Sequence, residues 1–176
     1  MCRQAVVVSW ARRRFSFYLA QDTQDSGVKV PKSNSDVNIL IIDDDQVDLR
    51  AIKRGLEKQK IVNNVVTACD GVEALQILRG QDGREKLPRP YLILLDLNMP
   101  RMNGIQFMHA LRHDPELMDS IVFVLTTSSS EEDQMEAYKE HIAGYLLKSE
   151  AGENFLKIIR MIEAFVLVVQ FPGEHR

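Results

Sequence analysis

The chain has 176 residues, of which 45% are hydrophobic and 27% are charged, and its formal net charge is −3. These values are typical of a soluble globular protein with one domain of ordinary size and an extension. They argue against a membrane-spanning protein, which needs an apolar run of about 18 residues or more, and against direct binding of nucleic acid, which needs clustered Lys and Arg.

The distribution of charge and the cysteines add to this first reading. Residues 1–35 carry six basic and two acidic side chains, a net charge of +4, so the remaining residues carry −7. Cys2 and Cys69 show neither the spacing of metal ligands nor the frequency of a disulfide scaffold, which fits a reducing compartment. We therefore expect a cytoplasmic protein.

The first 36 residues differ from the rest of the chain. They begin Arg-rich and without acidic residues, and continue as a polar stretch punctuated by Gly and Pro over residues 22–36. Such a segment is predicted to form little structure, as an extension or the product of a start codon assigned too early. An organelle transit peptide is the less favoured alternative. The domain itself is expected over residues 37–171, with a short tail over 172–176.

From Asn38 onward, short apolar segments alternate with amphipathic segments. The apolar segments predict strands over residues 38–42, 64–69, 91–96, 121–126 and 144–148. The amphipathic segments predict helices over residues 43–60, 70–80, 104–113, 128–141 and 153–169. Five strands alternating with five helices predict an α/β fold with a doubly wound parallel sheet and helices on both faces.

Local signals support several helix boundaries. Asp70 lies three residues before Glu73, as in a capping box, and Gly80 follows the same helix as a stop. The serines at 128–130 are placed to cap a helix with an acidic first turn. In the first helix, the residues expected on the apolar face are Val47, Leu49 or Leu56, Ile52 and Ala51. Asp45 is interpreted as a solvated residue at the helix start.

Polar residues end four of the predicted strands. Asp43 and Asp44 follow the first, Asp96 ends the third, Thr126 the fourth and Lys148 the fifth. The carboxyl ends of the strands meet at one edge of a doubly wound sheet, where such folds bind their ligands. One Lys cannot neutralise three neighbouring carboxylates, so we expect a hard divalent cation, for which Mg²⁺ is suitable.

This set of residues predicts phosphoryl chemistry. A carboxylate such as Asp96 can attack phosphorus and form an acyl phosphate. In phosphoryl transfer, the protein mainly positions groups and neutralises charge on the equatorial oxygens. Lys148 and Mg²⁺ would supply that positive charge, and the Thr126 hydroxyl would donate to a phosphoryl oxygen.

Four segments resemble the receiver domain of two-component response regulators: IIDDD (41–45), LLDLNMPRMNG (94–104), VLTTS (124–128) and GYLLKS (144–149). The separations of 30 residues from Asp96 to Thr126 and 22 from Thr126 to Lys148 agree with that family. The long loop over residues 80–90 makes the chain most similar to stand-alone receivers associated with bacterial phytochromes. The resemblance implies the flavodoxin-like strand order 2-1-3-4-5.

The resemblance also implies a role for each residue of the site. These roles are phosphoacceptor for Asp96, Mg²⁺ ligands for Asp43, Asp44, Asp96 and the backbone carbonyl of Asn98, switch hydroxyl for Thr126, switch aromatic for Tyr145 and phosphate-pairing ammonium for Lys148. Many receivers have Pro after this Lys, reached through a cis peptide. Here Ser149 follows, and a cis bond before it would cost about 3 kcal/mol, so the isomer of this peptide is left open.

The implied function is that of a single-domain response regulator, not an enzyme acting on an external substrate. A histidine kinase, phytochrome-like by family resemblance, would phosphorylate Asp96. Phosphorylation would remodel the face formed by residues 128–141, 144–148 and 153–169 for a downstream protein or phosphotransfer partner. The apolar stretch 165–171 is expected either to be buried or to form a contact, for instance in a homodimer.

Three alternatives are less well supported by the residues. A haloacid-dehalogenase-type phosphatase carries its nucleophile on the first strand as DxDGT or DxDGV, whereas DDDQVD follows here. A flavodoxin-like electron carrier needs a Gly- and hydroxyl-rich phosphate loop, and three Asp residues would repel the FMN phosphate. A receiver fold that binds partners without phosphate usually lacks the acceptor or the acidic pair, and both are present. This last reading is the main alternative.

Overall fold

The computed structural model describes residues 37–58, 63–148 and 153–169, so the expectations for residues 1–36 and 172–176 and for the Lys148–Ser149 peptide lie outside the described residues. Five parallel strands form one sheet in the order β2-β1-β3-β4-β5. Their bounds are β1 Asn38–Ile42, β2 Val65–Ala68, β3 Tyr91–Leu95, β4 Ile121–Thr126 and β5 Gly144–Leu147. The predicted fold class and strand order are confirmed.

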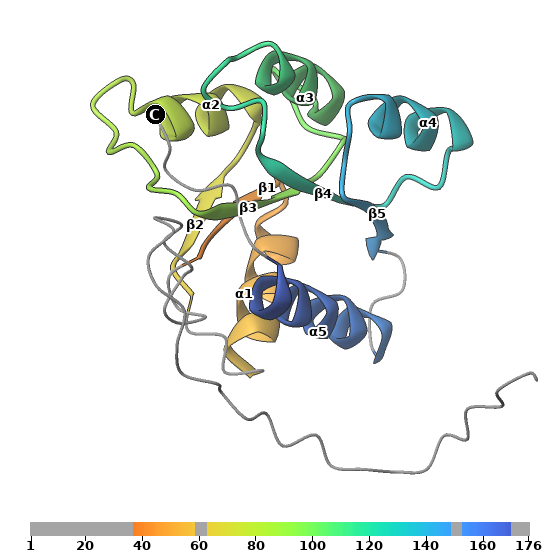
Figure 1. Cartoon of the computed structure of the whole chain (residues 1–176). Helices are drawn as coiled ribbons and strands as arrows, with labels where there is room; N and C mark the ends of the chain where they lie inside the picture. The colour runs from red at the N-terminus through yellow and green to blue at the C-terminus, as the bar shows by residue number, and fades with distance from the viewer. Residues whose placement is uncertain (1–36, 59–62, 149–152, 170–176) are drawn as a thin grey trace, which may run out of the picture.

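Helices cover both faces of this sheet. They are α1 Gln46–Lys58, α2 Gly71–Arg79, α3 Gly104–Arg112, α4 Glu131–Lys139 and α5 Glu153–Val168. Figure 1 shows α1 and α5 on one face, with α2, α3 and α4 on the other. None of the helices in the described part of the chain is long and apolar enough to cross a membrane.

The central strands are buried on both faces, which gives the domain two cores. Successive side chains of a strand point to opposite faces, and β1 illustrates this alternation. Leu40 and Ile42 belong to the core under α2 and α3, whereas Ile39 and Ile41 belong to the core under α1 and α5. All five residues of β1 and of β3 are buried, which explains why their sequences are almost continuously apolar.

The apolar face of α1 was predicted incorrectly in part. Leu49, Ile52 and Leu56 are buried, but Val47 is 67% exposed and Ala51 is also exposed. With 3.6 residues per turn, Val47 lies about 200° around the helix from Leu49, and Ala51 lies at the same large angle. The helix begins at Gln46 and not at Asp43, because Asp43 and Asp44 lie in the turn after β1 and Asp45 caps the helix.

The predicted caps are largely confirmed. Asp70 caps α2 by accepting the Glu73 N–H at 2.9 Å, and Gly80 ends the helix with φ of 66°. The Glu73 carboxylate accepts the N–H of Cys69, one residue before the cap, so the box is shifted by one position. Ser130 is the serine that caps α4.

The end of α5 is only partly exposed. Ile162 and Val166 are buried against the sheet, and Phe165 packs edge-on against Phe123 with ring centroids 5.0 Å apart. Val168 is 81% exposed. The stretch predicted to be either buried or a contact is therefore buried at Val166 and exposed at Val168, and its last two residues lie outside the described residues.

Candidate functional site

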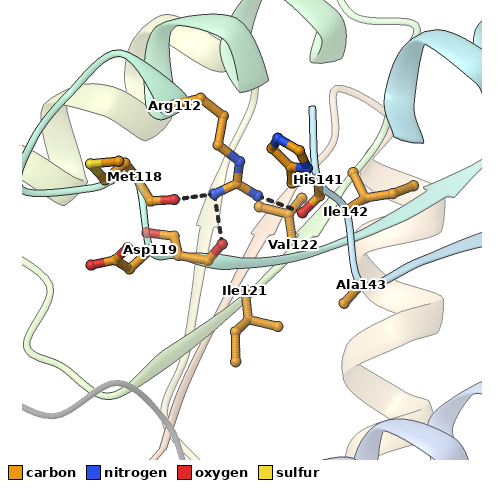
Figure 2. A pocket seen from close by; sticks show the side chains of 9 residues that line it. Arg112, Met118, Asp119, Ile121, Val122, His141, Ile142 and Ala143 are labelled. Carbon is orange, nitrogen blue, oxygen red and sulfur yellow. Dashed lines mark hydrogen bonds between the residues drawn. The ribbon is translucent and has the colours of Figure 1, made fainter. Parts of the chain in front are cut away.

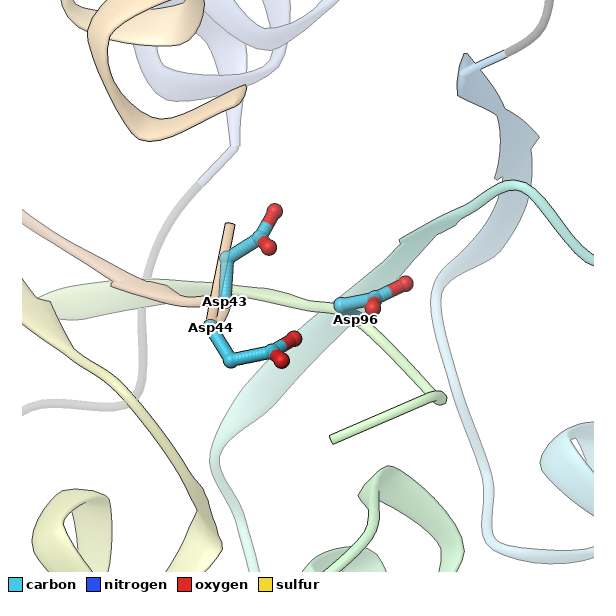
Figure 3. Close-up of side chains that lie close together, drawn as sticks. All are labelled: Asp43, Asp44 and Asp96. Carbon is cyan, nitrogen blue, oxygen red and sulfur yellow. The ribbon is translucent and has the colours of Figure 1, made fainter. Parts of the chain in front are cut away.

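Three carboxylates meet at the carboxyl edge of the sheet (Figure 3). Ile42 of β1 is paired with Leu95 of β3, so the next residues, Asp43 and Asp96, leave the sheet side by side. Asp43 and Asp96 are buried and Asp44 is exposed, and one oxygen of each lies within 4.8 Å of the others. The structure thus brings together the acidic residues that the sequence predicted at this edge.

Lys148 joins these carboxylates from the end of β5. Its Nζ lies 2.6 Å from Asp43 Oδ2, 2.9 Å from Asp48 Oδ2 and 3.6 Å from Asp96 Oδ1. Only 9% of the Lys148 side chain is exposed. Three carboxylates therefore surround one ammonium, and Asp96 Oδ1 is buried without a hydrogen-bond partner in the described part of the chain.

Burial and pairing act in opposite directions on the two closest groups. Burial raises the pKa of Asp43, and the Lys148 and Asp45 hydrogen bonds offset this only in part. Burial alone would lower the pKa of Lys148, but its hydrogen bonds to Asp43 and Asp48 and the charges of Asp43 and Asp96 raise it overall. The site therefore holds Lys148 firmly as an ammonium.

Asp45, the third acid of the sequence triplet, has a different role. Its Oδ1 accepts the N–H of Val47 at 2.7 Å, and its own N–H donates to Asp43 Oδ1 at 3.0 Å. The side chain is exposed. Asp45 thus starts α1 and orients Asp43, which confirms its interpretation as a helix-start residue.

Thr126 and Tyr145 both contact Ser128 in the loop between β4 and α4. Thr126 is fully buried, and its Oγ1 accepts the Ser128 N–H at 3.3 Å. The Tyr145 hydroxyl donates to the Ser128 carbonyl at 2.9 Å, and burial raises the Tyr145 pKa. The two predicted switch residues are therefore linked through the backbone of one residue.

The loop after Asp96 is held close by the start of α3. Asn98 lies in this loop with an exposed side chain, and the role of its carbonyl as a metal ligand stays a prediction. A Cβ on Gly104 would lie 2.5 Å from the Asp96 carbonyl oxygen and 2.8 Å from Leu97 Cα. Only glycine lets α3 approach the backbone of the phosphoacceptor candidate this closely, a constraint that sequence reasoning missed.

A separate depression of about 480 Å³ lies at the opposite edge of the sheet, at the start of β4 (Figure 2). Its walls include Arg112, whose guanidinium donates to four backbone carbonyls, those of Glu140, Met118, Ser120 and His141, at 2.6–3.0 Å. Because four N–H donors of the guanidinium are bonded to backbone carbonyls, we assign Arg112 a structural role.

Sequence reasoning also missed Asp48 as a member of the site. It lies in the first turn of α1, where an acid is expected simply to complement the helix dipole. Its contact with Lys148 spans 100 positions. Nothing in the local sequence indicates such a tertiary pairing.

The described residues can hold one metal ion at Asp43, Asp44 and Asp96. Carboxylate oxygens at this separation are hard donors, which Mg²⁺ prefers. The excess of negative charge and the unpartnered Asp96 oxygen also fit a cation. The donor set is therefore chemically suitable for Mg²⁺.

Comparison with known proteins identifies the class. Residues 39–160 match the family model of the response regulator receiver domain, and the chain belongs to this family of two-component signalling proteins.

Among its relatives, response regulator Rcp1 from Synechocystis sp. is 35% identical over 136 residues, which are 77% of this chain and 92% of Rcp1. The phosphorylated cyanobacterial phytochrome response regulator RcpA superposes with a TM-score of 0.71 at 34% identity, covering 77% of this chain and 98% of RcpA. The Mn²⁺-bound form of Rcp1 gives 0.70 at 34% identity, covering 77% and 99%. The predicted resemblance to phytochrome-associated regulators is confirmed.

Proposed function

We propose that this response regulator accepts a phosphoryl group on Asp96 from a phosphohistidine of a histidine kinase, with Mg²⁺ bound by Asp43, Asp44, Asp96 and the Asn98 carbonyl. The observation that carries the proposal is the environment of Asp96. Its Oδ1 is buried and lacks a hydrogen bond, yet lies 3.6 Å from the Lys148 ammonium and beside the acidic pair.

The transfer requires few participants. An Asp96 oxygen attacks phosphorus, an O–P bond forms and the N–P bond of the phosphohistidine breaks, so that the kinase imidazole leaves with the bonding electrons and takes a proton. Lys148 neutralises charge on the transferred oxygens, and the Thr126 hydroxyl donates to one of them. Bound Mg²⁺ would offset the negative charge that accumulates on the phosphoryl oxygens.

The signal would leave the site through Ser128. Thr126 Oγ1 accepts a hydrogen bond from the Ser128 N–H, and the Tyr145 hydroxyl donates one to the Ser128 carbonyl. If the Thr126 hydroxyl moved toward a phosphoryl group, its hydrogen bond with Ser128 would weaken. Tyr145 would then take a different rotamer. The phosphorylated state must be favoured by a few kcal/mol for such a population shift.

The proposed output surface is formed by α4, β5 and α5. Met135 and Tyr138 on α4 and Val168 on α5 are exposed apolar side chains, which suits a downstream protein, a phosphotransfer partner or a homodimer. We assign this function to the unit predicted over residues 37–171. The similarity to RcpA, described as a phytochrome response regulator, supports a phytochrome-like kinase upstream.

Intact-mass spectrometry after incubation with acetyl phosphate and Mg²⁺ tests the proposal. We expect one phosphoryl adduct on the wild-type chain and none on Asp96→Asn or in the presence of EDTA. Asp114→Asn, which removes an acid paired with Arg79 away from the site, is the matched control and should keep the adduct. If the wild-type chain gains no adduct and does not bind beryllofluoride, a phosphate-independent binding module becomes the better reading.

A further inference from the structure

Asp48 supplies the Lys148 ammonium with a partner outside the group of carboxylates that can hold a metal. It lies on α1, whereas Asp43 and Asp96 lie at strand ends. Its Oδ2 is 2.9 Å from Lys148 Nζ, and 34% of its side chain is exposed. The carboxylates close enough together to hold a metal are Asp43, Asp44 and Asp96, and Asp48 is not among them.

An ammonium has three N–H donors, and the geometry shows how they are divided. Asp43 at 2.6 Å and Asp48 at 2.9 Å are within hydrogen-bond distance of Nζ, whereas Asp96 at 3.6 Å is not. Two donors are therefore committed to Asp43 and Asp48. The third is left for the space beside Asp96, where a phosphoryl oxygen would arrive.

We propose that Asp48 is a positioning residue that keeps Lys148 oriented for the phosphoryl group on Asp96. This inference rests on the proposed function. Asp43 would share its oxygens with a bound cation, and its hold on Lys148 would weaken when the site is loaded. Asp48 would not bind the cation, so it would keep its hydrogen bond to Lys148 and maintain the orientation of the ammonium.

The backbone after Lys148 makes a side-chain anchor more important. Ser149 follows in the sequence, and serine does not fix the backbone angle as proline does. A four-carbon lysine stem is also flexible, and ordering it costs conformational entropy. Pairing with Asp48 offsets that cost before the phosphoryl group arrives.

The positioning role and a simple effect of charge predict opposite changes in anion binding when Asp48 is removed. If Asp48 acted only as one more negative charge near an anion site, removing it would strengthen anion binding. If it positions Lys148, removing it weakens binding. Asp45→Asn is the matched control, because it deletes a nearby exposed charge that does not contact Lys148. The backbone N–H that bonds to Asp43 is kept, and Asn remains a good helix cap.

The first measurement is calorimetric binding of beryllofluoride in saturating Mg²⁺ to the full chain, its Asp48→Asn variant and its Asp45→Asn variant. We expect Asp48→Asn to bind beryllofluoride about tenfold more weakly, which is the usual loss when a residue that orients a ligand-contacting side chain is removed. Asp45→Asn should bind within about twofold of the wild-type chain. The affinity for Mg²⁺ alone should be within about twofold in all three.

The second measurement uses no metal. Acetylation of Lys148 by a succinimidyl ester, followed by peptide mass spectrometry, should be several-fold faster in Asp48→Asn than in the wild-type chain, because the amine is less firmly held. Asp45→Asn should react at the wild-type rate. Unchanged labelling in Asp48→Asn would overturn the anchoring of Lys148 by Asp48.

The outcomes separate the two proposals. A wild-type chain that fails to bind beryllofluoride would overturn the proposed function. A wild-type chain that binds it, together with an Asp48→Asn variant that binds it equally or more tightly, would overturn only the positioning role. An equal loss in Asp45→Asn would also overturn that role, because general charge would then explain the effect.

Discussion

The two ends of the sheet each contain a partly or wholly buried cation, and they treat it differently. At the amino end of β4, Arg112 donates to four neutral backbone carbonyls, all of them fixed by the fold. At the carboxyl end, Lys148 faces carboxylates from two strands and a helix, and one oxygen of Asp96 has no hydrogen bond. At the first end, four of the five N–H donors of the cation are bonded and the end is nearly saturated. At the second end, the negative charge exceeds the positive charge.

This difference separates a structural site from one suited to a ligand. A saturated set of hydrogen bonds gains nothing from a further partner, whereas a buried carboxylate oxygen without a donor is costly. That cost falls when a cation binds. The depression near Arg112 is therefore less informative about function than the small acidic cluster (Figures 2 and 3).

The largest stability effect is expected at the saturated end. Arg112→Met leaves four carbonyls of two loops and the end of α4 without their donor, so we expect the free energy of unfolding to fall by about 3 kcal/mol. Urea unfolding monitored by circular dichroism measures it. Arg79→Met, which removes a partly exposed ion pair with Asp114, should cost less than about 1 kcal/mol. Equal effects of the two variants would contradict the distinction drawn for Arg112.

A second test concerns the backbone at the acidic end. Gly104→Ala places a methyl group against the Asp96 carbonyl and Leu97, and we expect a loss of about 2 kcal/mol with slower phosphorylation, because the loop carrying Asp96 must shift. Gly83→Ala is a suitable control. Its Cβ would meet nothing within 4 Å, although its φ of 76° is strained for alanine, so it should cost about 1 kcal/mol and leave phosphorylation unchanged. Normal phosphorylation kinetics in Gly104→Ala would contradict the role of this close approach.

Comparing these sites with the sequence shows what a pattern can and cannot predict. The strand-end residues Asp43, Asp96 and Lys148 were predictable, because parallel strands bring their carboxyl ends to one edge. Asp48 and Arg112 were not, since each lies at a helix end where its charge already suits the helix dipole. Their partners are chosen by tertiary packing.

The same distinction applies within one helix. In α1, periodicity correctly predicted that Ile52 faces the core, but it wrongly included Val47 and Ala51, which are exposed. A short apolar side chain fits a helical pattern on either face. Only the packing of α1 against the sheet and α5 decides which residues are buried.

A smaller effect of opposite sign is expected for Asp96→Asn. The substitution removes one of four crowded negative charges and an oxygen that lacks a donor, so without metal the free energy of unfolding should rise by about 1 kcal/mol. Urea unfolding in EDTA checks this gain. Asp114→Asn removes a carboxylate already paired with Arg79, and it should lower stability or leave it unchanged. A loss of stability in Asp96→Asn would mean that the acidic end is as well satisfied as the Arg112 end.

The smallest effect concerns Glu73, whose carboxylate accepts hydrogen bonds from Cys69 and Arg84. Its pKa is lowered below the usual 4.5, chiefly because it accepts from the Cys69 thiol and the Cys69 N–H, with Arg84 contributing. A lowered folded-state pKa contributes stability that is present above pH 4.5 and is lost as the pH falls through the folded-state pKa. Glu73→Gln should therefore be less stable than the wild-type chain at pH 6, by under about 1 kcal/mol. The difference should shrink as the pH falls below 4.5. Urea midpoints measured from pH 6 down to the lowest pH at which both chains fold provide the comparison. A constant difference would show that ionised Glu73 contributes no more than a neutral side chain of the same shape, unlike the charge-dependent cluster around Lys148.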